Sequence, residues 1–238
     1  MIHSFILYNA FVKRPTKDDR ARAIAEAALA AFSDKGYRLT QVADVAKLAG
    51  VAPGTIYLFA KSKEDLFWLA LKLAVGRPLE DATCKELTGE DLRAELIPTD
   101  ARLSLRHWLD QGSELPSLES VLLDHWNSVS HAARAIKLVE RCASDWPELA
   151  QAFFGELRVV VIRDLANYLE SAANAGLCRK VKDPRLAARL IIETIAWFAM
   201  HRLGDPDGRD ISVENARDVT IDALLHAFGL PSTTEEIL

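Results

Sequence analysis

The 238-residue sequence has few cysteines and no apolar run long enough to cross a bilayer. Its three cysteines, Cys84, Cys142 and Cys178, are far apart and form no CxxC pair. This spacing argues against a disulfide framework or a zinc cluster and fits a reducing cytoplasm, where the three would be small core residues. Charged residues interrupt every apolar segment, so we expect a cytoplasmic protein with no membrane partner.

The sequence also lacks the motifs of common catalytic sites. No GxSxG, P-loop, GxGxxG or HExxH pattern occurs. His125 and His131 lie six residues apart, which is off the i,i+4 spacing of a helical metal-binding pair. We therefore expect no enzyme, no catalytic residue, no metal and no cofactor.

Signals for β-strands are nearly absent, whereas apolar residues recur at helical spacing almost throughout. This pattern predicts an all-α fold. Glycine and proline mark the ends of most predicted helices. The longer predicted helices lie at about 17–35, 101–111, 117–131, 132–144, 147–175, 184–203 and 213–228, with a weak helix and a loop between 76 and 100.

Two short helices joined by a tight turn are predicted between Thr40 and Lys63. Thr40 is a suitable N-cap for the first, and Gly50 ends it. Pro53 stands near the start of the second, where its missing N–H costs little. This is the arrangement of a helix-turn-helix, whose second helix enters the major groove of DNA.

A fourth helix is predicted to begin after Ser62 and to run to about Val75. Ser62 is its expected N-cap, and Asp65 stands at the position that completes a short capping box. Because this helix joins the small head to the rest of the chain, its tilt is the expected lever between the two.

The charge distribution supports a nucleic-acid partner for the head only. The whole chain has a formal charge of −5, yet residues 1–75 contain 11 Lys and Arg against 7 Asp and Glu. The head therefore carries +4 and the remainder −9. A basic head on an acidic body is expected when one end alone meets phosphate.

Four short stretches in order resemble the DNA-binding head of the TetR/AcrR family of transcriptional repressors. They are TQVADVA at 40–46, AGV at 49–51, GTIY at 54–57 and KSKEDLF at 61–67. The resemblance covers about residues 17–70, under a quarter of the chain. It implies a homodimer whose heads bind a palindromic double-stranded operator and are released by a small apolar or aromatic effector.

The resemblance also implies which residues of the head contact DNA. They are Thr40, Gln41, Pro53, Gly54, Thr55, Tyr57, Leu58, Phe59 and Lys63. The chain departs from the family pattern at Phe59, which lacks a hydroxyl for phosphate, and at Ala60, which leaves the core of the head less filled unless Phe59 turns inward.

The rest of the chain is expected to form a larger helical body that binds the effector and dimerises. Its mid-helix aromatic residues Trp126, Phe154 and Tyr168 are candidate ligand contacts, although aromatic residues at helical spacing are more often core. The last two long helices carry the expected dimer interface, with the residues Ile191, Thr194, Ile195, Phe198, Val219 and Ala223.

These expectations divide the chain into four parts. Residues 1–14 form an N-terminal extension expected to be disordered, 15–62 the DNA-binding domain, 63–230 the ligand-binding and dimerisation domain, and 231–238 a C-terminal tail. An alternative stays open: the chain is a helical ligand-binding or adaptor module that does not bind DNA.

Overall fold

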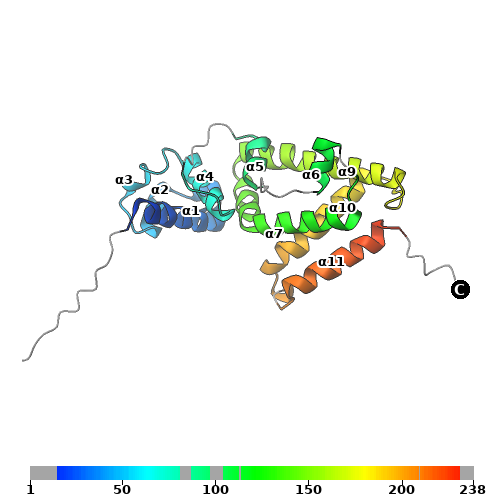
Figure 1. The fold of residues 1–238 in the computed structure, drawn as a ribbon. Coiled ribbons are helices and arrows are strands. Elements are labelled where there is room, and N and C mark those ends of the chain that lie inside the picture. The colour runs from blue at the N-terminus through cyan, green and yellow to red at the C-terminus, as the bar shows by residue number, and fades with distance from the viewer. Residues whose placement is uncertain (1–14, 81–86, 97–103, 113, 209, 231–238) are drawn as a thin grey trace, which may run out of the picture.

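The computed structural model describes residues 15–80, 87–96, 104–112, 114–208 and 210–230, and within these ranges it contains helices and no strand. Figure 1 shows a small head, α1–α4, at one end and a larger body, α5–α11, at the other. The prediction of an all-α fold with a helix-turn-helix head on a larger helical body is confirmed. The expected N-terminal extension, 1–14, and C-terminal tail, 231–238, lie outside the described residues.

The first helix of the head begins and ends at clear local signals. Thr16 and Asp19 form a reciprocal capping box at its start, with Asp19 N–H donating to Thr16 Oγ1 at 3.1 Å. Gly36 interrupts it with φ 81° and ψ −179°, a conformation open essentially to glycine alone. The predicted stop at Gly36 is therefore present, but one more helical turn follows. The helices of the head are α1 (Lys17–Leu39), α2 (Val42–Leu48), α3 (Pro53–Ile56) and α4 (Lys63–Ala74).

One predicted cap in the head is wrong and another is confirmed. Thr40 does not cap α2, whose N-cap is Gln41. The Thr40 side chain is buried and its hydroxyl lies within hydrogen-bonding distance of the carbonyls of Ala31 and Gly36, at 3.1 and 2.7 Å. Ser62 does cap α4, accepting a hydrogen bond from Asp65 N–H at 3.0 Å.

The body follows the predicted helices with two differences. A single long helix stands where helices at 117–131 and 132–144 were expected, because no glycine or proline interrupts it. The next long segment contains a π-helical turn, and the helix after it stops four residues before the predicted 203. The elements are α5 (Gly89–Leu96), α6 (Ser104–Gln111), α7 (Leu118–Ala143), α8 (Pro147–Ala150), the π-helical η1 (Gln151–Leu157), α9 (Arg158–Asn174), α10 (Pro184–Ala199), the 3-10 turns η2 (His201–Gly204) and η3 (Pro206–Gly208), and α11 (Val213–Phe228).

A buried arginine holds the connection between α10 and α11. The Arg202 guanidinium donates to the carbonyls of Phe198, Gly208 and Ile211, at 2.7, 3.2 and 2.8 Å. A cation at the C-terminal end of α10 is favourable, because the helix leaves carbonyl groups unpaired there. This contact fixes how the chain turns from α10 into α11.

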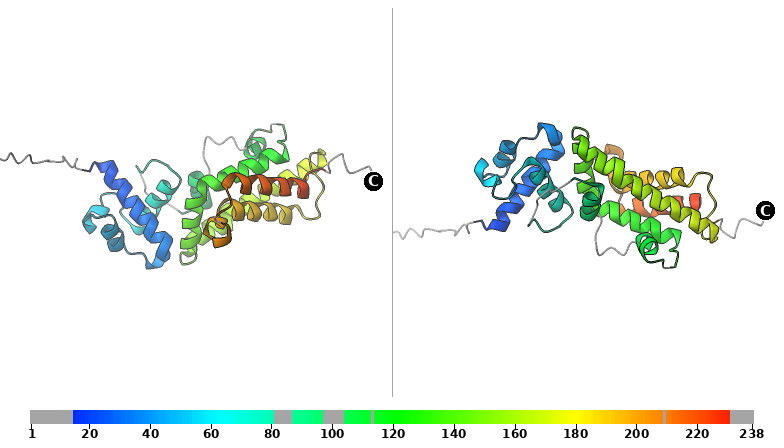
Figure 2. Two further views of the ribbon diagram at one scale, coloured as in Figure 1. Left: turned by 90° about the horizontal axis from the view of Figure 1, so that it is seen from below. Right: turned by 90° about the horizontal axis from the view of Figure 1, so that it is seen from above.

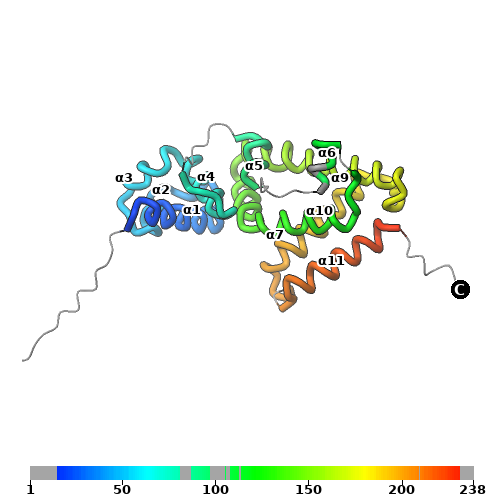
Figure 3. Tube along the Cα trace, viewed as in Figure 1, coloured from blue at the N-terminus to red at the C-terminus, as the bar shows by residue number. Residues whose placement is uncertain are grey.

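Two clusters of buried apolar residues form the core. The first joins α1–α4 to α5, the C-terminal half of α7, α8 and η1, and the second joins the N-terminal half of α7 to α9, α10 and α11. The head thus shares its core with one end of α7, as the trace in Figure 3 lets the reader follow. The predicted domain boundary at residues 62 and 63 stays a prediction, and apolar packing continues across it.

No helix in the described ranges is both long enough and apolar enough to span a membrane.

Candidate DNA interface and ligand cavity

The inner faces of α2 and α3 are fixed to the head by three buried residues. Val45 and Ala46 of α2 and Ile56 of α3 are at most 1% exposed. The two residues that follow α3 point to solvent: Tyr57 is 56% and Leu58 77% exposed. An exposed apolar tip next to a tyrosine hydroxyl suits contact with a base methyl group and a phosphate oxygen.

Most of the predicted DNA contacts lie on this surface. Gln41, Pro53, Gly54, Tyr57 and Leu58 are exposed, and Thr55 is half-buried.

Three predicted contacts are placed differently. Thr40 is buried and its hydroxyl is engaged inside the head, so we withdraw it as a phosphate contact. Phe59 is half-buried and packs against the head core, which compensates for the small Ala60 beside it. Lys63 is half-buried: its ammonium donates to Arg38 O at 3.3 Å and lies 4.6 Å from the centre of the Tyr37 ring, and burial lowers its pKa.

Two exposed lysines beside the motif were not predicted as contacts. Lys47 lies in the last turn of α2, and Lys61 lies just before α4. Both could meet DNA phosphates, and the signal for them was their sequence position next to the recognition helix.

Side chains at and just beyond the C-terminal end of α7 form hydrogen bonds with the backbone of α1 on both sides of Gly36. The Asp145 carboxylate accepts hydrogen bonds from Tyr37 N–H and Arg38 N–H, each at 3.1 Å. Arg141 donates to Asp34 O at 3.1 Å. These contacts use backbone groups that the interrupted helix leaves unpaired.

Aromatic stacking reinforces the same junction. The rings of Tyr37 and Trp146 stack with centroids 3.8 Å apart, and Phe67 of α4 meets Trp146 edge-on at 5.2 Å. The Tyr37 hydroxyl donates to Glu64 at 2.5 Å, which lowers the pKa of that carboxyl. Helices α1, α4 and the end of α7 therefore meet in one packed cluster.

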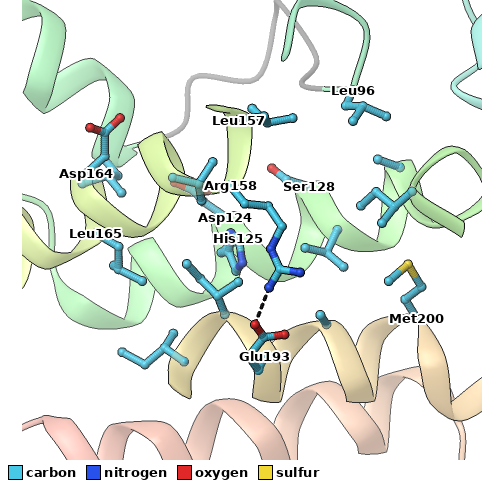
Figure 4. A pocket seen from close by; sticks show the side chains of 18 of the residues that line it. Leu96, Asp124, His125, Ser128, Leu157, Arg158, Asp164, Leu165, Glu193 and Met200 are labelled. Atoms are coloured by element: carbon cyan, nitrogen blue, oxygen red, sulfur yellow. Dashed lines mark hydrogen bonds and ion pairs between the residues drawn. The ribbon is translucent and has the colours of Figure 1, made fainter. Parts of the chain in front are cut away.

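The body contains a cavity of about 200 Å³ that is partly open to solvent. Residues of α5, α6, α7, η1, α9 and α10 line it, and most of them are apolar. Figure 4 shows Leu157, Leu165 and Met200 among the lining side chains. A cavity with mostly apolar walls and a few polar groups is the usual form of a small-molecule site.

Most of the charged groups around the cavity are paired with one another. Arg158 of α9 forms an ion pair with Glu193 of α10 (Figure 4), and Arg189 lies 3.5 Å from the same carboxylate. His201 Nε2 lies 3.7 Å from Glu140, and burial raises the pKa of the Glu140 carboxyl. These pairs offset the cost of placing charges beside an apolar space.

His125 is different, because its Nε2 has no hydrogen-bond partner among the residues that the structure describes. The atom is shielded from solvent and the side chain lines the cavity. Burial lowers the pKa of His125 from 6.5 to about 4, so the imidazole is neutral near neutral pH. The His125 ring thus forms part of the mostly apolar cavity wall, and a ligand reaches its shielded, unpaired Nε2 only after a small rotation of the ring.

None of the three predicted ligand contacts lines this cavity. Trp126 and Tyr168 are buried in the second core cluster, where the Tyr168 hydroxyl donates to Pro116 O at 2.8 Å. Phe154 is 43% exposed and lies beside Arg158, outside the cavity. The sequence of α7 did contain a signal for the cavity, because polar residues such as His125 interrupt its apolar stripe at helical spacing.

The predicted dimer residues divide between the two faces of their helices. Ile191 and Ile195 are fully buried inside the protomer, so the prediction that they face a partner is wrong. Phe198, Val219 and Ala223 are exposed, and Thr194 is half-buried.

An apolar surface covers the outer side of α10 and α11. Seen from below, α11 is nearest to the viewer and no other element lies over it (Figure 2). Leu186, Leu190 and Trp197 of α10 share a helical face, since successive members are four and seven positions apart, and Phe198 follows Trp197 directly. We call this surface the α10–α11 face; its large exposed residues are Leu186, Leu190, Trp197, Phe198, Val213 and Val219.

Comparison with known proteins finds one family model that matches the head and another that matches the body. The family model described as "Bacterial regulatory proteins, tetR family" matches residues 24–68. The model described as "AefR-like transcriptional repressor, C-terminal domain" matches residues 126–225.

Two curated relatives match the head. The fatty acid metabolism regulator protein of Bacillus subtilis (strain 168) is 44% identical over 57 residues, which is 24% of this chain and 29% of that protein. The HTH-type transcriptional regulator YhgD of the same organism is 53% identical over 49 residues, 21% of this chain and 26% of that protein. The chain therefore aligns with under a third of the length of these relatives.

Solved structures share the whole fold. AibR in complex with isovaleryl coenzyme A and operator DNA has a TM-score of 0.55 at 19% identity, covering 86% of this chain and 97% of that one. A TetR-like regulator from Rhodococcus sp. RHA1 has a TM-score of 0.54 at 20% identity, covering 90% and 98%. The SmeT–triclosan complex has a TM-score of 0.54 at 18% identity, covering 90% and 93%. Since the two family models match the head and the body in chain order, the chain belongs to the TetR family of bacterial transcriptional regulators.

Proposed function

We propose that this chain is a ligand-responsive DNA-binding regulator, a repressor that leaves its operator when a small molecule occupies the body cavity. The observation that carries the proposal is the shape of the head: Ile56 holds α3 against the core, and Tyr57 and Leu58 directly after α3 are exposed. A short helix fixed in this way can enter the major groove without rearrangement of the head.

The body supplies the other half of the proposal. The cavity of about 200 Å³ lies beside α7, and the end of α7 holds the corner of α1 through Asp145 and Arg141. A ligand that fits one position of α7 better than another changes the placement of the head. Two structural neighbours of the same fold, AibR with isovaleryl coenzyme A and operator DNA and SmeT with triclosan, hold a small molecule, which supports a ligand-binding role.

We propose further that the chain acts as a homodimer through the α10–α11 face. Large apolar side chains exposed on two adjacent helices are costly in water, and a second copy would cover them. A two-fold arrangement then presents two recognition helices to one palindromic operator, with a spacing near one turn of DNA.

The test measures binding of the purified protein to a duplex from its own upstream region by fluorescence anisotropy at several salt concentrations. The wild type is expected to bind specifically, with log affinity falling steeply against log salt, because lysines such as Lys47 and Lys61 displace counterions. Leu58→Glu places a negative charge on the exposed face of α3 and is expected to abolish binding.

Leu177→Glu is the matched control, because Leu177 is also exposed but lies in the body. It is expected to bind DNA as the wild type does. A wild-type protein that ignores the duplex even in dilute salt contradicts the proposal and supports the adaptor alternative.

A further inference from the structure

We propose that the effector is a neutral, mostly apolar molecule with one hydroxyl group, a phenol or an alcohol, whose hydroxyl binds His125 Nε2 in the body cavity. This inference rests on the proposed function, because it assigns the chemical class of the ligand that the cavity would take.

The first support is the isolation of His125 Nε2. A buried polar atom without a partner costs free energy, and such atoms are rare in native structures unless a ligand or water completes them. The cavity walls are mostly apolar, and Figure 4 shows Leu157, Leu165 and Met200 among the lining side chains. A ligand that supplies one polar group at this point recovers the missing hydrogen bond.

The second support is the neutral state of the ring, which makes a hydroxyl the most suitable partner. A neutral imidazole carries its proton on either nitrogen, so Nε2 either donates or accepts. A hydroxyl does both, and it therefore pairs with His125 in either tautomer. A carbonyl, which only accepts, or an ammonium group, which only donates, matches one tautomer only.

The third support is the charge of the lining, which disfavours an anion. Four carboxylates, those of Asp124, Glu140, Asp164 and Glu193, stand against the two arginines Arg93 and Arg158. A carboxylate or phosphate ligand would meet net negative charge in a region of low dielectric.

A cationic ligand is disfavoured for a different reason. Glu193 already pairs with Arg158 and Arg189, Asp164 lies 3.3 Å from the Arg163 guanidinium, and Glu140 lies beside His201. A cation would have to displace one of these partners. A neutral ligand leaves all of them in place.

The size of the cavity limits the ligand. An apolar protein cavity of roughly 150 Å³ holds a benzene ring. The cavity here is about 200 Å³, so it admits one ring with a few further atoms. An alkylphenol with a short side chain fits both this size and the one unpaired nitrogen of His125.

The experiment is calorimetric titration of the purified protein, without DNA and near neutral pH, with four probes on one carbon frame: 4-propylphenol, propylbenzene, 4-propylbenzoate and 4-propylbenzylamine. The wild type is expected to bind the phenol most tightly of the four. The preference for 4-propylphenol over propylbenzene is expected to fall about tenfold in His125→Phe, which keeps a ring and loses the nitrogen. Comparing this ratio between proteins cancels the different hydration of the two probes.

His131→Phe is the matched control, because His131 lies on the same helix, is exposed and does not line the cavity. It is expected to keep the wild-type preference. His125→Leu removes the same nitrogen with a smaller side chain and is expected to lose the preference as well, so the test does not depend on one variant folding. An equal preference in the wild type and both His125 variants, or tighter binding of the benzoate or the benzylamine than of the phenol, overturns the proposal.

The inference and the proposed function fail separately. A protein that shows the His125-dependent preference but binds no operator contradicts the regulator and leaves the ligand class standing. A protein that binds operator but shows no such preference contradicts the ligand class alone.

Discussion

Replacement of Gly36 by alanine is expected to be strongly destabilising, because this residue carries both a special backbone conformation and a tight contact with the body. At φ 81° and ψ −179° any residue with a Cβ is strained by about 1–3 kcal/mol. The new Cβ would also lie 2.5 Å from Arg141 Nη1 and 2.9 Å from Asp145 Oδ2. Both side chains would have to move, which weakens their hydrogen bonds to α1 by about 1 kcal/mol each.

Alanine substitutions at two other glycines measure the backbone strain separately from the close contacts of the new Cβ. Gly50 has φ 65° but open space around its Cβ position, so Gly50→Ala carries the strain alone, about 1–2 kcal/mol. Gly54 lies in α3 with open space and no positive φ, so Gly54→Ala is expected to be neutral or to stabilise by up to about 1 kcal/mol. Gly36→Ala is expected to cost about 3–5 kcal/mol in total, which is the largest loss of the three.

The assay is urea denaturation followed by circular dichroism, with all proteins at one concentration, because dimerisation would make stability depend on concentration. In thermal melts a loss of 3 kcal/mol corresponds to a fall of roughly 6–12 °C for a chain of this size. A Gly36→Ala protein no less stable than Gly50→Ala would refute the reasoning, since it would mean that the contact between α1 and the end of α7 contributes nothing.

Three further predictions concern the body. Between pH 6.5 and about 4 the unfolded chain protonates His125 and the folded one does not, so the free energy of unfolding is expected to fall by about 3 kcal/mol as the pH drops through this window. His125→Phe should remove most of this loss and His131→Phe should not; identical pH profiles measured by urea denaturation would contradict the burial of His125. Phe198→Glu is expected to give monomers in sedimentation velocity, with Leu177→Glu as the control that stays dimeric, and an unchanged sedimentation coefficient for Phe198→Glu would exclude the α10–α11 face as the interface. Trp146→Leu removes the stacking at the junction and is expected to keep ligand binding by calorimetry while weakening ligand-induced release of DNA by at least severalfold; normal release would show that the aromatic cluster does not couple the two sites.

The parts of the fold that follow local chemistry could be predicted from the sequence. Ser62 caps α4 because its hydroxyl is next to a free N–H at the helix start, a relation confined to four residues. Gly36 and Gly50 have the positive φ expected of glycines at helix ends. Thr40 has the same chemistry as Ser62, yet a tertiary feature decides its role: the corner at Gly36 brings two carbonyls within reach of its hydroxyl, and no local rule contains that contact.

The cavity could not be predicted residue by residue, because packing rather than residue type decides which side chains border an empty space. Trp126 and Tyr168 were chosen as large amphipathic residues, and such residues also fill a core well, which is their role here. The dimer prediction failed for the same reason at Ile191 and Ile195: an apolar helix shows two apolar faces in sequence, and only the fold tells which one is covered. Phe198 and Val219 were placed correctly at the surface, but their partner stays a proposal.

The position of α7 changes the expected route between ligand and DNA. The sequence suggested α4 as the lever, since it joins head to body along the chain. In the structure α7 lines the cavity from Val121 to Glu140, and the residues just beyond, Arg141 and Asp145, hold the backbone of α1. A helix is stiff along its axis, and the stretch from His125 to Asp145 spans roughly 30 Å. A ligand that displaces α7 therefore acts directly on the helix that supports the recognition element, while α4, packed in the same core, follows both. The route through α7 depends on contacts far apart in the sequence, which the order of helices does not show, while α4 stays the lever predicted from the sequence.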